Sequence, residues 1–178
     1  ASDSVEAIQT RMEATGDVDV YLPIGGASVG DHDHMRRAFA GAGFEPIFEK
    51  VAVRPGKPTW FSQRGNQRVL GLPGNPASAM VCAHLFLSPL LGVDWSGKLL
   101  TGQLTKSLPA NGPREHFMRA RAEMAKTGAI DIDPAPNQDS SLLTPFLSCN
   151  ALIRRLPNES ARDSGDFIQI LPIAAIIQ

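Results

Sequence analysis

The chain of 178 residues lacks several features that would narrow its interpretation at once. It has two cysteines, Cys82 and Cys149, far apart in apolar surroundings, which excludes a disulfide framework and predicts buried, reduced thiols. No apolar run approaches the ~20 residues that a membrane-spanning helix needs. The first residues have neither the basic nor the apolar segment of a signal peptide. We therefore expect a cytoplasmic protein with no membrane partner.

An excess of charge of one sign is also missing. Lysine and arginine number 17 and aspartate and glutamate 18, and neither half of the chain is markedly basic. Binding of nucleic acid through many phosphate contacts requires such an excess, so we expect no nucleic-acid partner. Sites for small anions need only a few residues and stay open.

The first half of the chain alternates helical and strand-like patterns. Val5, Ile8 and Met12 follow helical spacing, with Ser4 or Asp3 as the helix cap. The patterns predict helices over 4–14, 33–42 and 76–91, strands over 17–24 and 44–53, and a hairpin over 60–72 that turns at 64–66. Such alternation predicts an α/β fold with a parallel-type sheet and ligand-binding loops at the carboxyl ends of its strands.

Helical periodicity disappears after residue 93. Strand-like segments cover residues 98–104, 116–124, 130–132 and 166–171, and Gly- and Pro-rich turns separate them. Short strands with such turns predict a small all-β domain. The boundary is placed between residues 92 and 96, which gives domains of residues 1–93 and 94–178.

Three Gly- or Pro-rich loops follow predicted strands, with the sequences GGASVGDHDH (25–34), RPGKP (54–58) and GLPGNPAS (71–78). Glycine lets backbone N–H groups approach an anion, and a helix N-terminus adds partial positive charge. In the third loop, Asn75 is a suitable helix cap and Pro76 a suitable first helical residue. One such loop is most simply a tight turn, but three at one sheet edge indicate a binding site for an anionic ligand.

The side chains in these loops leave alternatives open. Asp31 and Asp33 could cap a helix or hold Mg²⁺ beside a bound phosphate, whereas His32 and His34 lack further partners for a zinc site. Arg54 and Lys57 form either a solvated turn or a pair of cations for an oxyanion. Arg114, Arg119 and Arg121, taken alone, predict a solvated strand edge, and His84 a histidine of the core.

Three motifs, GGASVGDHD, VAVRPGKPTWF and GLPGNPASAMVCAHLFLSPLL, occur in an order and spacing that resemble the molybdopterin molybdenumtransferases, the MoeA and gephyrin E-domain family. The Arg-rich strand PREHFMRA and the segments QDSS and SCNALIRRLP resemble the C-terminal β-barrel domain of that family. The resemblance extends from residue 4 to about residue 173. It implies a MogA-like α/β sandwich followed by a small barrel-like domain.

The resemblance also implies an activity and its partners. Members of this family insert molybdate into adenylylated molybdopterin, with release of AMP. They use Mg²⁺, form dimers and act after a molybdopterin adenylyltransferase, which is an expected partner. A relative that itself adenylylates molybdopterin shares the α/β domain, but the RPGKP and GLPGNP loops with a barrel favour the molybdate-inserting branch.

Site residues follow from the matched motifs. The implied catalytic residues are Asp33 and Lys57, and the implied magnesium ligands are Asp31 and Asp33. The implied substrate-binding residues are Gly25, Gly26, Ser28, Gly30, Arg54, Gly56, Gly74, Asn75, Pro76, Ser78, Arg114 and Ser140. Arg114 and Ser140 match positions that bind the molybdate oxyanion, and the third loop matches a wall for the phosphate end of the substrate.

One departure from the family pattern limits these implications. The family normally carries more of the α/β domain, including its first strand, and two further domains ahead of the segment that matches residue 1. We therefore expect a truncated α/β sandwich that is inactive by itself when conversion of adenylylated molybdopterin is assayed. The alternative function is a non-catalytic module that binds molybdopterin or phosphate, or serves as a scaffold.

Overall fold

The computed structural model describes residues 4–26, 33–139, 141 and 144–176. It contains two sheets, and the first has four strands. These strands are β1 (Val20–Tyr21), β2 (Glu45–Phe48), β4 (Trp60–Arg64) and β5 (Gln67–Gly71). Their order is β1–β5–β4–β2, and only β1 and β5 run parallel. The predicted parallel-type sheet is thus wrong. A tight turn at Gly65 and Asn66 joins β4 to β5, and so short a connection can only join antiparallel strands.

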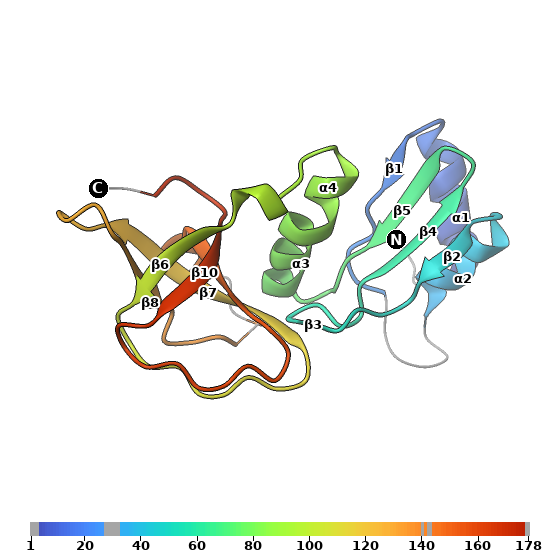
Figure 1. Cartoon of the computed structure of the whole chain (residues 1–178). Coiled ribbons are helices and arrows are strands. Elements are labelled where there is room, and N and C mark those ends of the chain that lie inside the picture. Colours follow the sequence, from blue (N-terminus) through green and yellow to red (C-terminus); the bar gives the residue numbers. More distant parts are fainter. Residues whose placement is uncertain (1–3, 27–32, 140, 142–143, 177–178) are drawn as a thin grey trace.

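Two helices cover one face of this sheet (Figure 1). They are α1 (Val5–Thr15) and α2 (His34–Gly41), and both confirm predicted helices. Ser4 caps α1 by accepting a hydrogen bond from the backbone N–H of Ala7, at 3.2 Å. The core between helices and sheet consists of aromatic and apolar side chains, namely Met12, Phe39, Phe44, Trp60 and Val69.

A third helical segment lies on the other face, between the two sheets (Figure 1). It consists of α3 (Pro76–Cys82), the π-helical turn η1 (Ala83–Leu87) and α4 (Ser88–Leu90), which confirms the predicted apolar helix. Leu70 and Leu72 point to this segment because alternate residues of a strand face opposite sides of a sheet. Val81 and Leu85 pack in turn against Phe117 and other barrel residues.

The second sheet closes on itself as a barrel. Its strands are β3 (Val53–Arg54), β6 (Leu100–Leu104), β7 (Glu115–Met124), β8 (Ile130–Pro134), β9 (Ala151–Arg155) and β10 (Phe167–Pro172). Their order is β3–β7–β8–β6–β10–β9, and pairing of β9 with β7 completes a ring of five strands. Short 3-10 turns, η2 (Ser96–Lys98) and η3 (Thr144–Leu147), lie outside the ring. The interior is apolar, with Leu104, Ile132, Ile153 and Ile170 at its centre.

The α/β part and the barrel confirm the predicted fold class, but two strands differ from prediction. The single strand predicted over 44–53 is two strands in different sheets, since β2 pairs with β4 and β3 pairs with β7. Strand β9 was not predicted as a strand, because its short run of Ala151, Leu152 and Ile153 is followed at once by two arginines. Within the described ranges, every helix is too short or too polar to cross a membrane.

Candidate functional site

A cavity of about 380 Å³ lies where the β3–β4 loop, helix α3 and the barrel meet. Its walls come from the loop between β3 and β4, the first turn of α3, the start of β7 and the segment after β8. The lining residues are Arg54, Pro55, Gly56, Lys57, Pro58, Ser78, Arg114, His116, Gln138 and Asp139. The structure thus brings together the predicted site residues Arg54, Gly56, Lys57, Ser78 and Arg114, from segments that are far apart in the sequence.

The RPGKP loop is held in this place at both ends. Strand β3 pairs with β7 of the barrel, and Arg54 lies opposite His116. On the other side the backbone N–H and the hydroxyl of Thr59 both donate to the carbonyl oxygen of Gly56, at 2.9 and 2.7 Å. Gly56 is buried with φ of +128°, and a Cβ on it would collide with the Sγ atom of Cys82 in α3. The loop therefore links barrel and helix, and Lys57 projects from it into solvent.

The GLPGNPAS segment turns from β5 into α3 as its sequence predicts. Asn75 caps the helix, since its side chain accepts a hydrogen bond from the backbone N–H of Ser78, and Pro76 is the first helical residue. Ser78 is buried at the edge of the cavity. Gly74 lies against Gly25, and a Cβ on Gly74 would lie 3.1 Å from the Gly25 Cα atom. The first and third loops therefore adjoin, because they leave the carboxyl ends of the parallel strands β1 and β5.

Replacing Asn75 with alanine is expected to lower the free energy of unfolding by about 1 kcal/mol, since a capping side chain is lost. Urea unfolding followed by circular dichroism measures the change. Aspartate at this position can cap the helix and serves as the matched control. Equal stability of the wild-type chain and the Asn75→Ala variant would contradict this role of Asn75.

The barrel wall of the cavity depends on Arg119. This side chain is 3% exposed and donates to the backbone carbonyl oxygens of Asn137 and Asp139, at 3.3 and 2.9 Å. Gln138 fastens the same segment, since its amide group bonds both the N–H and the carbonyl of Arg119. The predicted solvated edge is thus wrong for Arg119, although Arg121 is exposed and pairs with Glu123. Ser140, the predicted oxyanion ligand, follows this segment directly but lies outside the described residues.

The cavity is lined by three cationic side chains, Arg54, Lys57 and Arg114, that form no ion pair with a described carboxylate. The guanidinium of Arg114 has five N–H donors. One of them donates a hydrogen bond to the carbonyl oxygen of Val53, at 3.5 Å. Asp139 accepts hydrogen bonds from the backbone N–H and hydroxyl of Ser141, which lower its pKa and keep it ionised. One carboxylate against three cations leaves a site suited to an anion with several oxygens.

His116 is one of the lining residues that sequence reasoning missed, together with Pro55, Pro58, Gln138 and Asp139. His116 is 8% exposed, and burial together with nearby guanidinium groups lowers its pKa from 6.5 to about 4, burial being the larger cause. The imidazole is therefore neutral at physiological pH. One signal was available, because His116 follows Arg114 by two residues and shares its side of the strand. The pairing of β7 with β3, which places Arg54 beside it, was not predictable from either segment.

The remaining predicted residues with described positions do not line this cavity. Asp33 caps α2 through the backbone N–H of Arg36 and forms an ion pair with the Arg36 Nε atom at 2.6 Å. Gly25, Gly26, Gly74, Asn75 and Pro76 lie on the adjoining loops. Ser28, Gly30 and Asp31 lie outside the described residues.

Of the two predicted magnesium ligands, Asp31 and Asp33, only Asp33 has a described position. Each carboxylate oxygen has two lone pairs, and the contacts with Arg36 occupy one on each. The donor type therefore fits a hard cation that takes one or two carboxylates together with phosphate oxygens. No group of three or more His, Cys, Asp or Glu side chains that could hold a metal ion occurs in the described part of the chain.

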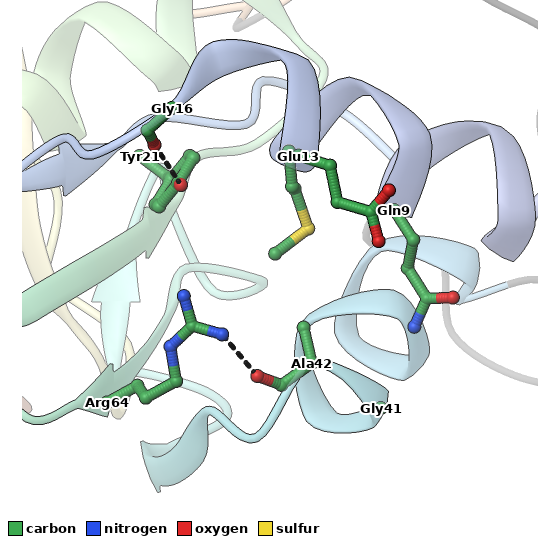
Figure 2. A pocket seen from close by; sticks show the side chains of 8 residues that line it. Gln9, Glu13, Gly16, Tyr21, Gly41, Ala42 and Arg64 are labelled. Carbon is green, nitrogen blue, oxygen red and sulfur yellow. Dashed lines mark hydrogen bonds between the residues drawn. The ribbon is translucent and has the colours of Figure 1, made fainter.

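A second cavity, of about 420 Å³, lies at the far end of the first sheet between α1, α2 and the β4–β5 hairpin. Two of its polar side chains donate hydrogen bonds to backbone carbonyl oxygens of the same cavity, as Figure 2 shows. Arg64 donates to the carbonyl oxygen of Ala42 at 2.6 Å, and the Tyr21 hydroxyl donates to that of Gly16 at 3.3 Å. None of the predicted site residues lines it. These contacts tie the helices to the sheet, and the smaller, cationic cavity is the candidate site.

Comparison with known proteins supports this reading of the fold. Residues 1–92 match a family model described as "Probable molybdopterin binding domain", and residues 101–173 match the "MoeA C-terminal region (domain IV)". A molybdopterin biosynthesis MoeA protein of Pyrococcus horikoshii has the same fold, with a TM-score of 0.75 at 22% identity over 97% of this chain and 42% of its own.

Two curated relatives share sequence with nearly the whole chain. A molybdopterin molybdenumtransferase of Bacillus subtilis is 31% identical over 90% of this chain and 38% of its own length. The molybdenum cofactor synthesis protein cinnamon of Drosophila melanogaster is 30% identical over 98% of this chain and 30% of its own length. The chain thus spans about a third of the curated relatives that it matches. With a molybdopterin-binding domain followed by the MoeA C-terminal region, the chain belongs to the MoeA family.

Proposed function

We propose that this chain takes part in molybdenum cofactor biosynthesis by binding molybdate for its insertion into adenylylated molybdopterin, with release of AMP. The observation that carries the proposal is the convergence of Arg54, Lys57 and Arg114 on one cavity without a carboxylate partner among the described residues. A tetrahedral dianion is bound best by such cations together with hydroxyl groups. The relative named molybdopterin molybdenumtransferase supports this choice of oxyanion.

Each residue has a distinct part in the proposed site. Arg114 presents its planar guanidinium fork to two oxygens of the anion, whereas Lys57 supplies a mobile point charge. Arg54 adds charge to the cavity wall, and the buried Ser78 supplies a hydroxyl donor at its edge. Lys57 also stabilises the negative charge that develops as the adenylate ester is displaced, which is the catalytic role proposed for it. Ser140, beside Asp139, is proposed as a further hydroxyl ligand.

The adjoining loops are proposed to bind the phosphate end of the substrate. Gly25 and Gly74 bring the first and third loops into contact, since neither carries a Cβ, and the backbone N–H groups of these loops are proposed to face the anion. Asn75 and Pro76 begin the helix beside them, and Ser28 and Gly30 are proposed to complete this wall. Asp31 and Asp33 are proposed to hold magnesium beside the phosphate, where the metal supplies charge neutralisation.

The resemblance to the family also guides proposals about domains, assembly and location. We propose domains of residues 1–93 and 94–178, a homodimer and a cytoplasmic location. An adenylyltransferase is proposed to supply the substrate, because the reaction consumes an adenylate ester.

Calorimetric titration of the 178-residue chain with sodium molybdate at about pH 7.5 tests the oxyanion site. We expect saturable binding that sulfate displaces and chloride at the same ionic strength does not. Conversion of adenylylated molybdopterin, measured in parallel, separates a catalytic function from the binding-module alternative. Heat that is only that of dilution, at every molybdate concentration, would contradict the proposed site.

A further inference from the structure

His116 occupies a special position among the cations of the site. It lies in β7 between two other strands, opposite Arg54 of β3 on one side and Arg155 of β9 on the other. Its side chain lines the cavity although it is 8% exposed. No hydrogen bond joins its ring nitrogens to another described residue. The imidazole is thus available to a ligand in the cavity.

The surroundings of His116 oppose its protonation when the cavity holds no anion. The pKa is lowered to about 4, and burial is the largest of the causes. The contributing guanidinium groups, in decreasing order of effect, belong to Arg54, Arg155, Arg114 and Arg119. A dianion in the cavity would cancel much of this repulsion and could accept a hydrogen bond from a protonated ring.

We infer that His116 couples the binding of a tetrahedral oxyanion dianion in this cavity to the uptake of one proton, so that the anion binds more tightly as the pH falls. The inference rests on the proposed oxyanion site and adds its regulation. A neutral imidazole offers one donor and one acceptor, so at most one of its nitrogens can donate a hydrogen bond to the anion. Protonation converts both nitrogens to donors and completes a shell of donors around the anion.

The acidic groups around the cavity are bonded or ion-paired within the protein, and Lys57 faces solvent. Asp139 is bonded to Ser141, which lowers its pKa, and Glu159, the ion-pair partner of Arg155, also has a lowered pKa. Glu115 turns to Arg154, and burial raises the pKa of Cys82 to about 11. A change in affinity between about pH 5 and about pH 8 therefore reports on His116.

The direction and size of the effect follow from linkage. A group whose pKa rises on binding adds affinity below the pKa of the complex, and the gain is complete below the pKa of the free protein, here about 4. If the anion restores the pKa of His116 to its ordinary 6.5, affinity at about pH 5 exceeds that at about pH 8 by roughly 30-fold. The gain disappears as the pH rises through the pKa of the complex.

Calorimetric titration with sulfate, which stays a dianion throughout this range, measures the affinity at each pH. Repeating it in two buffers of different ionisation enthalpy counts the protons taken up, and we expect close to one per sulfate at about pH 5.5. In the His116→Gln variant, which keeps a neutral donor but cannot titrate, affinity should be the same across the range. His84→Gln is the matched control, because His84 is half-buried in η1 and does not line the cavity.

Failure of the proton-coupling inference can be distinguished from failure of the oxyanion site. Nuclear magnetic resonance of the wild-type imidazole should show its pKa rise when sulfate is added, and this needs no variant that folds. Sulfate binding that depends on Lys57 and Arg114 but takes up no proton would overturn the inference and leave the oxyanion site intact. Absence of sulfate and molybdate binding at every pH would instead overturn the site itself.

Discussion

Replacing Arg114 with alanine is expected to weaken molybdate binding about 10- to 100-fold. The guanidinium lines the cavity from the start of β7 and has no carboxylate partner among the residues with described positions. Hydrogen bonds between charged groups contribute about 1.5–3 kcal/mol each, and about 1.4 kcal/mol corresponds to a factor of ten. Truncation leaves the anion with fewer donors in a partly buried place, so the loss is largely in the rate of dissociation.

Two variants give this prediction its controls. Arg121→Ala removes an exposed arginine of β7 that pairs with Glu123 and does not line the cavity, so binding should be unchanged. Arg114→Lys keeps the charge without the fork and should bind with intermediate affinity. Calorimetry with molybdate gives the affinities, and urea unfolding shows whether each variant is folded. Equal affinity of the Arg114→Ala and Arg121→Ala variants would show that the anion does not bind here.

Replacing Gly56 with alanine is expected to lower the free energy of unfolding by about 3 kcal/mol and to abolish molybdate binding. The new Cβ would collide with the Sγ atom of Cys82, and φ of +128° is strained for any residue with a side chain. The neighbours cannot give way easily, because Cys82 is fully buried in α3. The loop would have to leave the helix, which displaces Lys57 from Arg114.

Backbone strain and collision can be separated experimentally. Gly65→Ala places a side chain at φ of +55° in the hairpin turn, where no atom lies within 4 Å, so it reports strain alone. Cys82→Ala removes the colliding sulfur, and the double variant Gly56→Ala/Cys82→Ala should recover part of both stability and binding. Unfolding in urea and titration with molybdate measure the two effects. If Gly56→Ala costs no more than Gly65→Ala, the loop is not packed on α3 as described.

Local chemistry alone was sufficient to predict most elements of the fold. Ser4, Asp33 and Asn75 each cap the helix that their sequence pattern predicts, since a cap depends on residues within one turn. The hairpin at Gly65 and the α/β-then-barrel order were predictable in the same way. The motifs also selected the residues proposed as anion ligands, but as separate loops without a common cavity.

Strand pairing determines where those loops lie relative to one another. Nothing within residues 44–54 indicates that β2 and β3 enter different sheets, yet that division brings the RPGKP loop to the barrel. The same pairing sets Arg54 beside His116, and the contacts of Arg119 bring the segment before Ser140 to the same cavity. Such contacts join positions up to about sixty residues apart, and their energy depends on burial that no local pattern contains. The sequence by itself therefore determined the elements and the family, whereas only the tertiary structure decided which cations meet and that a neutral histidine lies among them.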